Sequence, residues 1–340
     1  MILVKRNPPI TIWLWTVSFM VLMMVLIGGV TRLTDSGLSM VDWKPIMGAI
    51  PPLNDAEWNK AFDMYKAYPE FKKVNFEMDL AGFKSIFFWE YFHRLFGRLI
   101  GLVFFLPYMY FLVRKELNSR LNLKLIIALL LGGSQGLMGW YMVQSGLVDR
   151  PDVSHFRLAA HLGLAFLILG YLYWLILEIK NKRAVRVLLV PFKKTLIIFS
   201  SLVVIQILFG AFVAGLDAGL THNTFPKMGR NWIPPELINA ISNPSELIHN
   251  PVVIQFIHRT IGICIGFYSL FLWRASFKST LFLQKRSFQM IFAVVLIQII
   301  LGVMTLLHYV PISLASLHQI VAAVLLLLVV RLWFFSFHRY

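Results

Sequence analysis

The stretch FWEYFHRLFGRLIG, residues 88–101, places a glutamate, a histidine and two arginines inside an otherwise apolar run. Residues 254–266, IQFIHRTIGICIG, repeat the pattern and keep the histidine, the first arginine and both glycines. The histidines lie 165 residues apart (258 − 93 = 165), and Glu90 of the first copy becomes Gln255 in the second. Ionisable side chains are costly inside a bilayer, so a segment that carries them twice is expected to use them.

Long apolar segments make up most of the remaining chain. Of its 340 residues 58% are hydrophobic, and the mean hydropathy is +0.72. Crossing a bilayer core takes about 20 residues, and spanning segments must be helical because lipid offers no partners to backbone groups. The sequence therefore predicts an all-α integral membrane protein with eight transmembrane helices. We place them at residues 10–30, 85–113, 125–148, 156–177, 195–216, 251–273 and, divided near Pro311, twice within 287–330.

The net charge of +16 is distributed as in a membrane protein rather than as in a nucleic-acid-binding one. Basic residues precede the first span and gather in the loops after spans two, four and six, which by the positive-inside rule places both termini in the cytoplasm. They include Lys5, Arg6, Arg114, Lys115, Arg120, Lys124, Lys180, Lys182, Arg183, Arg186, Lys193, Lys194, Arg274, Lys278, Lys285 and Arg286. Neither a secretory cleavage site nor a transit peptide is evident, which favours a bacterial plasma (inner) membrane.

The repeated segment indicates a tandem repeat of two four-helix bundles, residues 1–184 and 185–340. The motif LTDSGL at 33–38 resembles GLDAGL at 215–220, and His161 corresponds to His318 (318 − 161 = 157). An even number of spans per half gives both halves the same orientation in the membrane. The long first loop contains DAEWNKAFDMYKAYPEF, residues 55–71, whose spacing predicts short helices on the outer face.

Four of the nine histidines lie within even-numbered spans. Three of them follow Ile86, Pro251 or Pro311 by seven residues, about 10 Å at 1.5 Å per residue, so all four are expected at similar depth in the outer leaflet. A single such histidine is more often a structural core residue. A matched pair in each half suits two axial ligands to one heme iron. The candidate ligands are His93, His161, His258 and His318.

Each charged residue near these histidines has two possible roles. Arg94, Arg98 and Arg259 could hold heme propionates through charge-assisted bonds, or could extend to the outer headgroups. Glu90, on the same helix face as His93, could move protons near the metal, or could form an ion pair with Arg94. Since the second half has only Gln255 there, we predict that the first half does chemistry and the second stores or relays electrons.

Six motifs, in order along the chain, resemble the heme A synthase family, the heme O hydroxylases of cytochrome oxidase biogenesis. The single cysteine, Cys264, excludes an intramolecular disulfide, and the chain resembles the branch without the cysteine pair of the first outer loop. The motifs are GGVTRLTDSGLSMVDWKP (28–45), FFWEYFHRLFGRLIG (87–101), GGSQGLMGWYMVQSGL (132–147), FRLAAHLGLAF (156–166), NTFPKMG (223–229) and SLHQIVA (316–322).

This resemblance implies oxidation of the C8 methyl group of heme O, by way of an alcohol, to the formyl group of heme A. It places heme O and heme A in the N-terminal half with His93 and His161, and heme b in the C-terminal half with His258 and His318. Glu90 falls on the functional glutamate of the family. An external electron donor is implied; heme O synthase, cytochrome oxidase assembly factors and a second copy of the chain are further candidate partners.

One difficulty and two alternatives remain open at this stage. If both His93 and His161 bind the substrate iron, oxygen has no open coordination position there, so either one ligand leaves or oxygen does not bind that iron. A quinol-linked, diheme b-type electron-transfer protein would need similar histidine pairs. A transporter is the other alternative, suggested by the repeat alone, although broken spans in corresponding positions are not evident.

Overall fold

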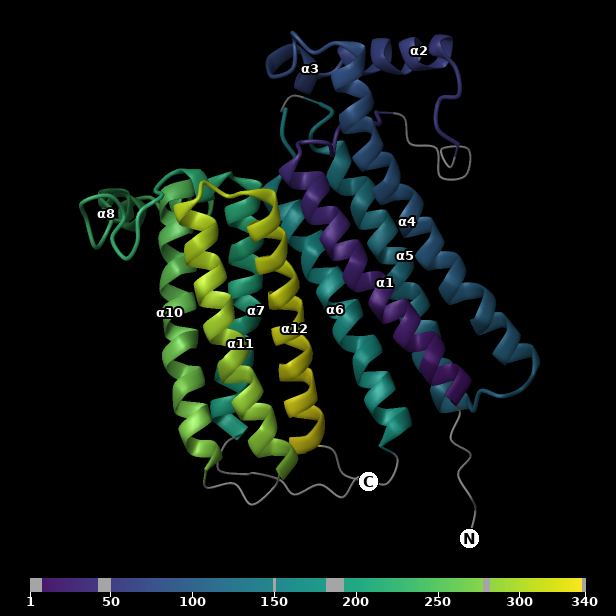
Figure 1. Cartoon of the computed structure of the whole chain (residues 1–340), viewed down its shortest axis with the longest axis vertical. Coiled ribbons are helices and arrows are strands. Elements are labelled where there is room, and N and C mark those ends of the chain that lie inside the picture. The colour runs from purple at the N-terminus through teal and green to yellow at the C-terminus, as the bar shows by residue number, and fades with distance from the viewer. Residues whose placement is uncertain (1–7, 42–49, 149–150, 182–192, 278–281, 338–340) are drawn as a thin grey trace. The chain divides into compact units, whose positions relative to one another are not determined.

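The computed structural model describes residues 8–41, 50–148, 151–181, 193–277 and 282–337 (Figure 1). These ranges contain eight helices that are long and apolar enough to cross a membrane, and no strand. The predicted all-α membrane fold with eight spans is confirmed, including the division next to Pro311. The helices are α1 (Pro8–Leu33), α4 (Leu80–Val113), α5 (Ser119–Gln144), α6 (His155–Lys180), α7 (Lys193–Gly215), α10 (Pro251–Ser276), α11 (Phe282–Leu307) and α12 (Ile312–Phe337).

Helix α4 begins earlier than its hydropathy indicates. It has 34 residues and starts at Leu80, where the Asp79 carboxylate accepts a hydrogen bond of 2.8 Å from the Gly82 N–H. At 1.5 Å per residue this helix is about 51 Å long, well beyond a hydrocarbon core of about 30 Å. His93 therefore lies 13 residues from the helix start (93 − 80 = 13). The helix start expected near Ile86 was therefore wrong, while the depth of His93 within the membrane remains a prediction.

The described chain forms two compact units, residues 19–165 and residues 1–18 with 166–340, and the division passes through α1 and α6. The predicted boundary between residues 184 and 185 lies outside the described ranges. The tandem repeat and the cytoplasmic termini remain predictions. Six of the loop residues used for that orientation are also outside the described ranges: Lys5, Arg6, Lys182, Arg183, Arg186 and Lys278.

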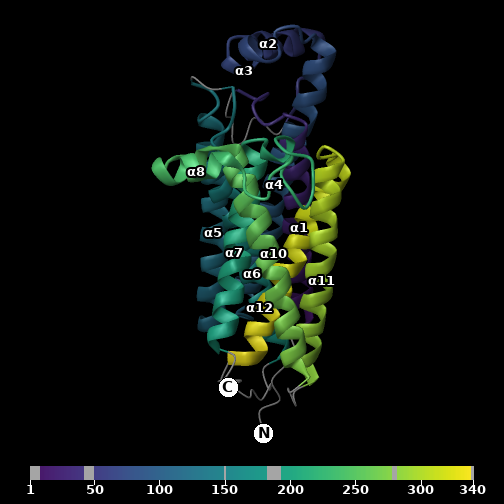
Figure 2. The ribbon, with the colours of Figure 1, turned by 90° about the vertical axis from the view of Figure 1, so that its left-hand side faces the viewer.

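The unit that contains the C-terminus is built around α7, α10, α11 and α12, which run side by side in both views (Figures 1 and 2). Each helix contributes buried apolar residues to one core, because each carries an apolar face along its whole length. The Trp333 indole N–H donates to the Ser200 hydroxyl at 2.6 Å, so this polar pair is satisfied inside the core. Core residues are Leu196, Phe199, Val203, Ile265, Leu272, Phe288, Ile291, Val295, Leu325, Leu328, Val329 and Leu332.

Between α7 and α10 the chain forms three short helices, η3 (Ala218–Leu220), α8 (Pro235–Ser242) and α9 (Glu246–His249). In the other unit, α2 (Asp55–Lys66) and α3 (Pro69–Lys73) confirm the short helices predicted for the first loop. They pack on the first turns of α4 through four buried aromatic residues, and the rings of Phe62 and Phe83 stack at 5.1 Å. The early start of α4 thus provides the surface that holds α2 and α3.

Glu70, in α3, gives this packing a pH dependence. It is 6% exposed, its Oε2 has no hydrogen-bond partner among the described residues, and burial raises the pKa of its carboxyl from 4.5 to about 8. The folded state then holds a proton that the unfolded chain releases near pH 4.5. The stability that this proton provides is fully present below pH 4.5 and is lost as the pH rises through about 8.

We therefore expect α2 and α3 to open more readily at pH 8.5 than at pH 6, after correction for intrinsic exchange rates. Glu70→Gln should remove this difference, since a neutral amide does not titrate. Hydrogen–deuterium exchange of residues 55–73 measures it. The exposed Glu77 supplies the control, Glu77→Gln. Equal pH dependence in the Glu70→Gln variant and the wild type would show that another group is responsible.

Candidate functional site

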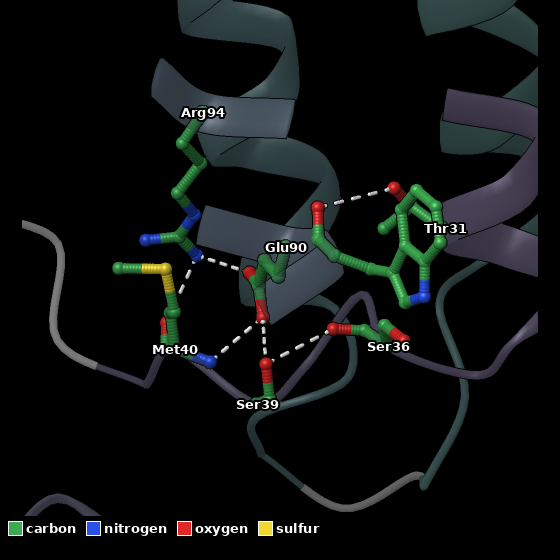
Figure 3. A network of polar contacts seen from close by, with 7 residues as sticks. Thr31, Ser36, Ser39, Met40, Glu90 and Arg94 are labelled. Carbon is green, nitrogen blue, oxygen red and sulfur yellow. Dashed lines mark hydrogen bonds and ion pairs between the residues drawn. The ribbon is translucent and has the colours of Figure 1, made fainter. Parts of the chain in front are cut away.

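Glu90 lies at the centre of a buried polar network (Figure 3). It is 3% exposed, and its Oε2 accepts hydrogen bonds from the Ser39 hydroxyl and the Met40 N–H, both at 2.7 Å. Arg94, one turn along α4, donates to Glu90 Oε1 at 2.5 Å and to the Met40 carbonyl at 2.9 Å. The ion pair considered from the sequence is therefore present. Together the two side chains attach the segment after α1 to α4.

The segment reaches α4 because α1 ends in a sharp turn. Asp35 adopts the left-handed conformation (φ 48°), which stops the helix and reverses the chain direction. The Thr34 and Ser36 hydroxyls lie 2.7 Å apart and close the turn. As a result the Ser39 hydroxyl and the Met40 N–H, two hydrogen-bond donors, face the carboxylate of Glu90.

The second unit contains the same arrangement with opposite polarity. Gln255 is 2% exposed, and its amide donates to the carbonyls of Ala218, at 2.8 Å, and His222, at 3.2 Å. Arg259 donates to Gln255 Oε1 at 3.0 Å and to the His222 carbonyl at 2.6 Å. Here the loop presents acceptors, so an amide suits it, whereas the first loop presents donors that suit a carboxylate. The Glu90 and Gln255 difference is thus matched by the polarity of the two loops.

Exchanging these two side chains should destabilise the protein. In Glu90→Gln the side chain has one acceptor oxygen, whereas both oxygens of the carboxylate accept hydrogen bonds. The NH2 group must therefore face the N–H of Met40 or of Arg94, and a buried donor is left unsatisfied at a cost of about 1–3 kcal/mol. Gln255→Glu should cost a similar amount or more, since its carboxylate would face two carbonyl oxygens. The thermal unfolding midpoint in detergent should fall for both variants and stay unchanged for the surface control Glu77→Gln. Unchanged midpoints in both would contradict the polarity match.

The four candidate histidines occur as two pairs, each pair within one compact unit. His93 on α4 and His161 on α6 both belong to the unit of residues 19–165, and His258 on α10 and His318 on α12 both belong to the other unit. All four are half-buried. The comparison of depth between the two pairs, and their role as ligands, remain predictions.

A glycine lies opposite each histidine ring, on the helix that precedes it among the eight. A methyl group added at Gly139, Gly210 or Gly302 would lie 3.0–3.2 Å from the ring carbon Cε1, closer than most real contacts, whereas one at Gly28 would lie 3.6 Å from it, an ordinary contact distance. The pairs are Gly28 with His93, Gly139 with His161, Gly210 with His258, and Gly302 with His318. This set was not identified from the sequence.

Three of these glycines follow a glutamine by four residues. Each glutamine contacts the histidine that lies opposite its own glycine. The Gln135 amide lies 3.2 Å from His161 Nε2 and donates to the His161 carbonyl at 3.1 Å. Gln206 and Gln298 make the equivalent pairs of contacts, at 3.3 and 3.0 Å with His258, and at 3.3 and 2.9 Å with His318. The recurrence Q-x-x-x-G in odd-numbered spans is the sequence signal that identifies them.

The two glycines that follow each repeated histidine, Gly97 and Gly101 in the first copy and Gly262 and Gly266 in the second, serve mainly close packing. A methyl group at Gly97 would lie 3.2 Å from Met24 Cε, one at Gly262 3.2 Å from Gln206 Nε2, and one at Gly266 2.9 Å from an Ile299 methyl. Only at Gly101 is nothing found within 4 Å among the described residues. Gly97, Gly262 and Gly266 therefore admit a neighbouring helix, while the space beside Gly101 is open among the described residues.

The residues present fit a heme ligated by two imidazoles in each unit. Each ring faces a position without a side chain, and the Nδ1 atoms of His258 and His318 are buried without a hydrogen-bond partner among the described residues. The buried Oε1 atoms of Gln135, Gln206 and Gln298 also have none there. Such atoms are rare in proteins and call for an explanation, and a bound polar group is one.

Comparison with known proteins agrees with this geometry. The profile of the COX15-CtaA family, described as "Cytochrome oxidase assembly protein", matches residues 11–330. A protein named "Heme A synthase" from Nitrosospira multiformis is 46% identical, covering 96% of this chain and 92% of its own length. Proteins of that name from Flavobacterium psychrophilum and Rickettsia felis are 43% and 44% identical, covering 95% and 96% of this chain and 96% and 97% of their own. With its half-buried histidine pairs and eight spanning helices, the chain belongs to the COX15-CtaA family of cytochrome oxidase assembly proteins.

Proposed function

We propose that the chain is a heme A synthase, which oxidises the C8 methyl group of heme O, by way of an alcohol, to the formyl group of heme A. The family match and the names of the relatives support this activity over the diheme electron-transfer alternative. The observation that carries the proposal is the difference between the units: both hold an imidazole pair, and only one places a buried carboxylate, Glu90, one turn from a histidine. The eight spans make the chain a multi-pass protein of the bacterial inner membrane.

We assign the substrate to the N-terminal half, residues 1–184, and heme b to the C-terminal half, residues 185–340. His93 and His161 would hold heme O or heme A, and His258 and His318 would hold heme b. A heme held by such a pair of histidines would supply transfer of single electrons. Glu90 would hold or deliver a proton beside the substrate, because it is the ionisable acid nearest His93 on that helix face.

The two arginines suit different tasks. Arg94 is neutralised by Glu90 at 2.5 Å, whereas Arg259 contacts the Gln255 amide oxygen and two loop carbonyls, those of His222 and Thr224, all of them uncharged. No carboxylate pairs with Arg259 among the described residues. The charge of Arg259 is therefore available to an anionic propionate of heme b, and Arg94 would contribute to the substrate side together with Glu90.

The partners follow from the chemistry. Oxidation of a methyl group to a formyl group removes electrons from the heme and adds an oxygen atom, so an oxidant must accept those electrons. When dioxygen is that oxidant, the external electron donor supplies the further electrons that reduce it to water. Heme O synthase, cytochrome oxidase assembly factors and a second copy of this chain remain candidate partners. The assignment to the branch without the outer-loop cysteine pair rests on the sequence, which has no cysteine in that loop.

Expression of the full chain together with a source of heme O tests the activity. Extracted hemes are separated by chromatography and identified by mass. Heme A should appear only when the intact chain is present, and not in cells that make heme O alone. Unchanged heme O together with a normal reduced b-type spectrum would overturn the proposal in favour of electron transfer.

A further inference from the structure

The four histidines differ in the side chain that faces them from the preceding helix, and the proposed function does not depend on this difference. Three of them face a glutamine, located four residues before the glycine opposite the ring. The first helix pair has Met24 at this position, four residues before Gly28. The equivalence is structural as well, because Met24 reaches Gly97, four residues after His93, as Gln206 reaches Gly262, four residues after His258. His93 is therefore the histidine with a thioether in place of the amide.

The glutamine amide restrains a histidine in two ways. It donates to the main-chain carbonyl of the histidine at 2.9–3.1 Å, and it lies 3.2–3.3 Å from the ring nitrogen. Iron at that nitrogen would replace the longer contact and leave the shorter bond to the carbonyl. Because this bond fixes the main chain from which the ring extends, the histidine loses less conformational freedom when it binds a ligand, so these partners strengthen ligation.

Met24 cannot restrain His93 in this way. A thioether has no N–H to donate, and its three rotatable bonds make it adaptable rather than fixed. Packing around the ring is also looser there, since a methyl group at Gly28 would lie 3.6 Å from His93 Cε1, against 3.0–3.2 Å at the other three glycines. Both observations single out the same histidine.

We propose that the side chain at this position determines how firmly a histidine holds a heme iron, with Gln135, Gln206 and Gln298 as positioning residues for the firmer ligands and Met24 beside the weaker one. Met24 then makes His93 the ligand from which the substrate-side heme is released. The inference rests on the proposed function, in which heme O enters and heme A leaves while heme b stays. It also concerns the missing open coordination position on the substrate iron, because it identifies His93 as the histidine that would dissociate from that iron.

A reciprocal exchange of the two side chains tests this proposal. The full chain, purified with heme O and heme B and kept without an electron donor, is mixed with an excess of a heme-free globin. The heme that remains bound is extracted over time, and chromatography separates heme O from heme B, so each site is followed by its own heme. The variants are Met24→Gln and Gln206→Met, with Met24→Leu as a control of similar volume that cannot donate a hydrogen bond.

Met24→Gln should slow the release of heme O on the order of tenfold, while Met24→Leu leaves it unchanged; Gln206→Met should speed the release of heme B by a similar factor. A slower release cannot result from damage to the fold, which would only loosen the heme. If Met24→Gln releases heme O as fast as Met24→Leu, or Gln206→Met retains heme B like the wild type, the proposal is wrong. Failure of the proposed function is visible separately, as the absence of heme A when the intact chain receives electrons.

Discussion

Replacing Glu90 with alanine should lower the rate of heme A formation by at least about a hundredfold, the usual contribution of a positioned acid or base. The substitution removes the carboxylate one turn from His93 and leaves the donors of Ser39, Met40 and Arg94 without their acceptor. Heme b should stay bound, since His258 and His318 belong to the other compact unit. Chromatography with mass detection measures the conversion, and a reduced-minus-oxidised spectrum measures the b-type heme.

Two further variants distinguish a chemical role of the Glu90 carboxylate from its role in holding the segment after α1. Glu77→Ala removes an exposed carboxylate and should leave both readouts unchanged. Glu90→Asp keeps the charge with a side chain one methylene shorter, so it should retain more activity than Glu90→Ala if the carboxylate acts chemically. Loss of the b-type spectrum in Glu90→Ala would contradict the division of labour between the halves.

The fold could be predicted largely because lipid limits what the chain can do. Eight apolar segments of sufficient length had to be helices, and Pro311 had to separate the last two. The start of α4 could not be predicted from hydropathy, because residues 80–84 are held in the helix by the Asp79 cap and by α2 and α3 rather than by lipid. Tertiary packing extended that helix beyond its apolar segment.

Those parts of the candidate site that depend on the type of side chain could be predicted from the sequence. The parts that depend on main-chain hydrogen bonds could not. Glu90 and its replacement by Gln255 are visible in the repeat. The donor that faces Glu90 is in part the Met40 N–H, which every residue but proline carries, so no sequence pattern reveals it. The polarity of the loop, and with it the structural reason for the glutamate, appears only once the chain turn at Asp35 is seen.

The glutamines are a different case, because their recurrence was present in the sequence. Gln135, Gln206 and Gln298 each precede a glycine by four residues, in spans where a lone polar residue is costly. What the spacing leaves undetermined is which neighbouring helix they face. The structure shows that each meets the histidine of the following span, and this turns an isolated polar residue into part of the site.

Replacing His258 with alanine should remove heme b, leaving less than about a tenth of the wild-type content, because one of its two proposed ligands and the contact to Gln206 are both lost. His93→Ala should leave heme b in place and affect the heme O content instead, since His93 lies in the other unit. The heme content per protein and the b-type spectrum measure both effects.

His308→Ala provides the matched control for these substitutions. His308 lies at the end of α11, is exposed, and its Nδ1 contacts only the Met304 carbonyl of its own helix among the hydrogen bonds found, at 2.8 Å. Its loss should change neither heme. If His258→Ala kept its b-type heme, the ligand pair of the C-terminal half would have to be sought elsewhere.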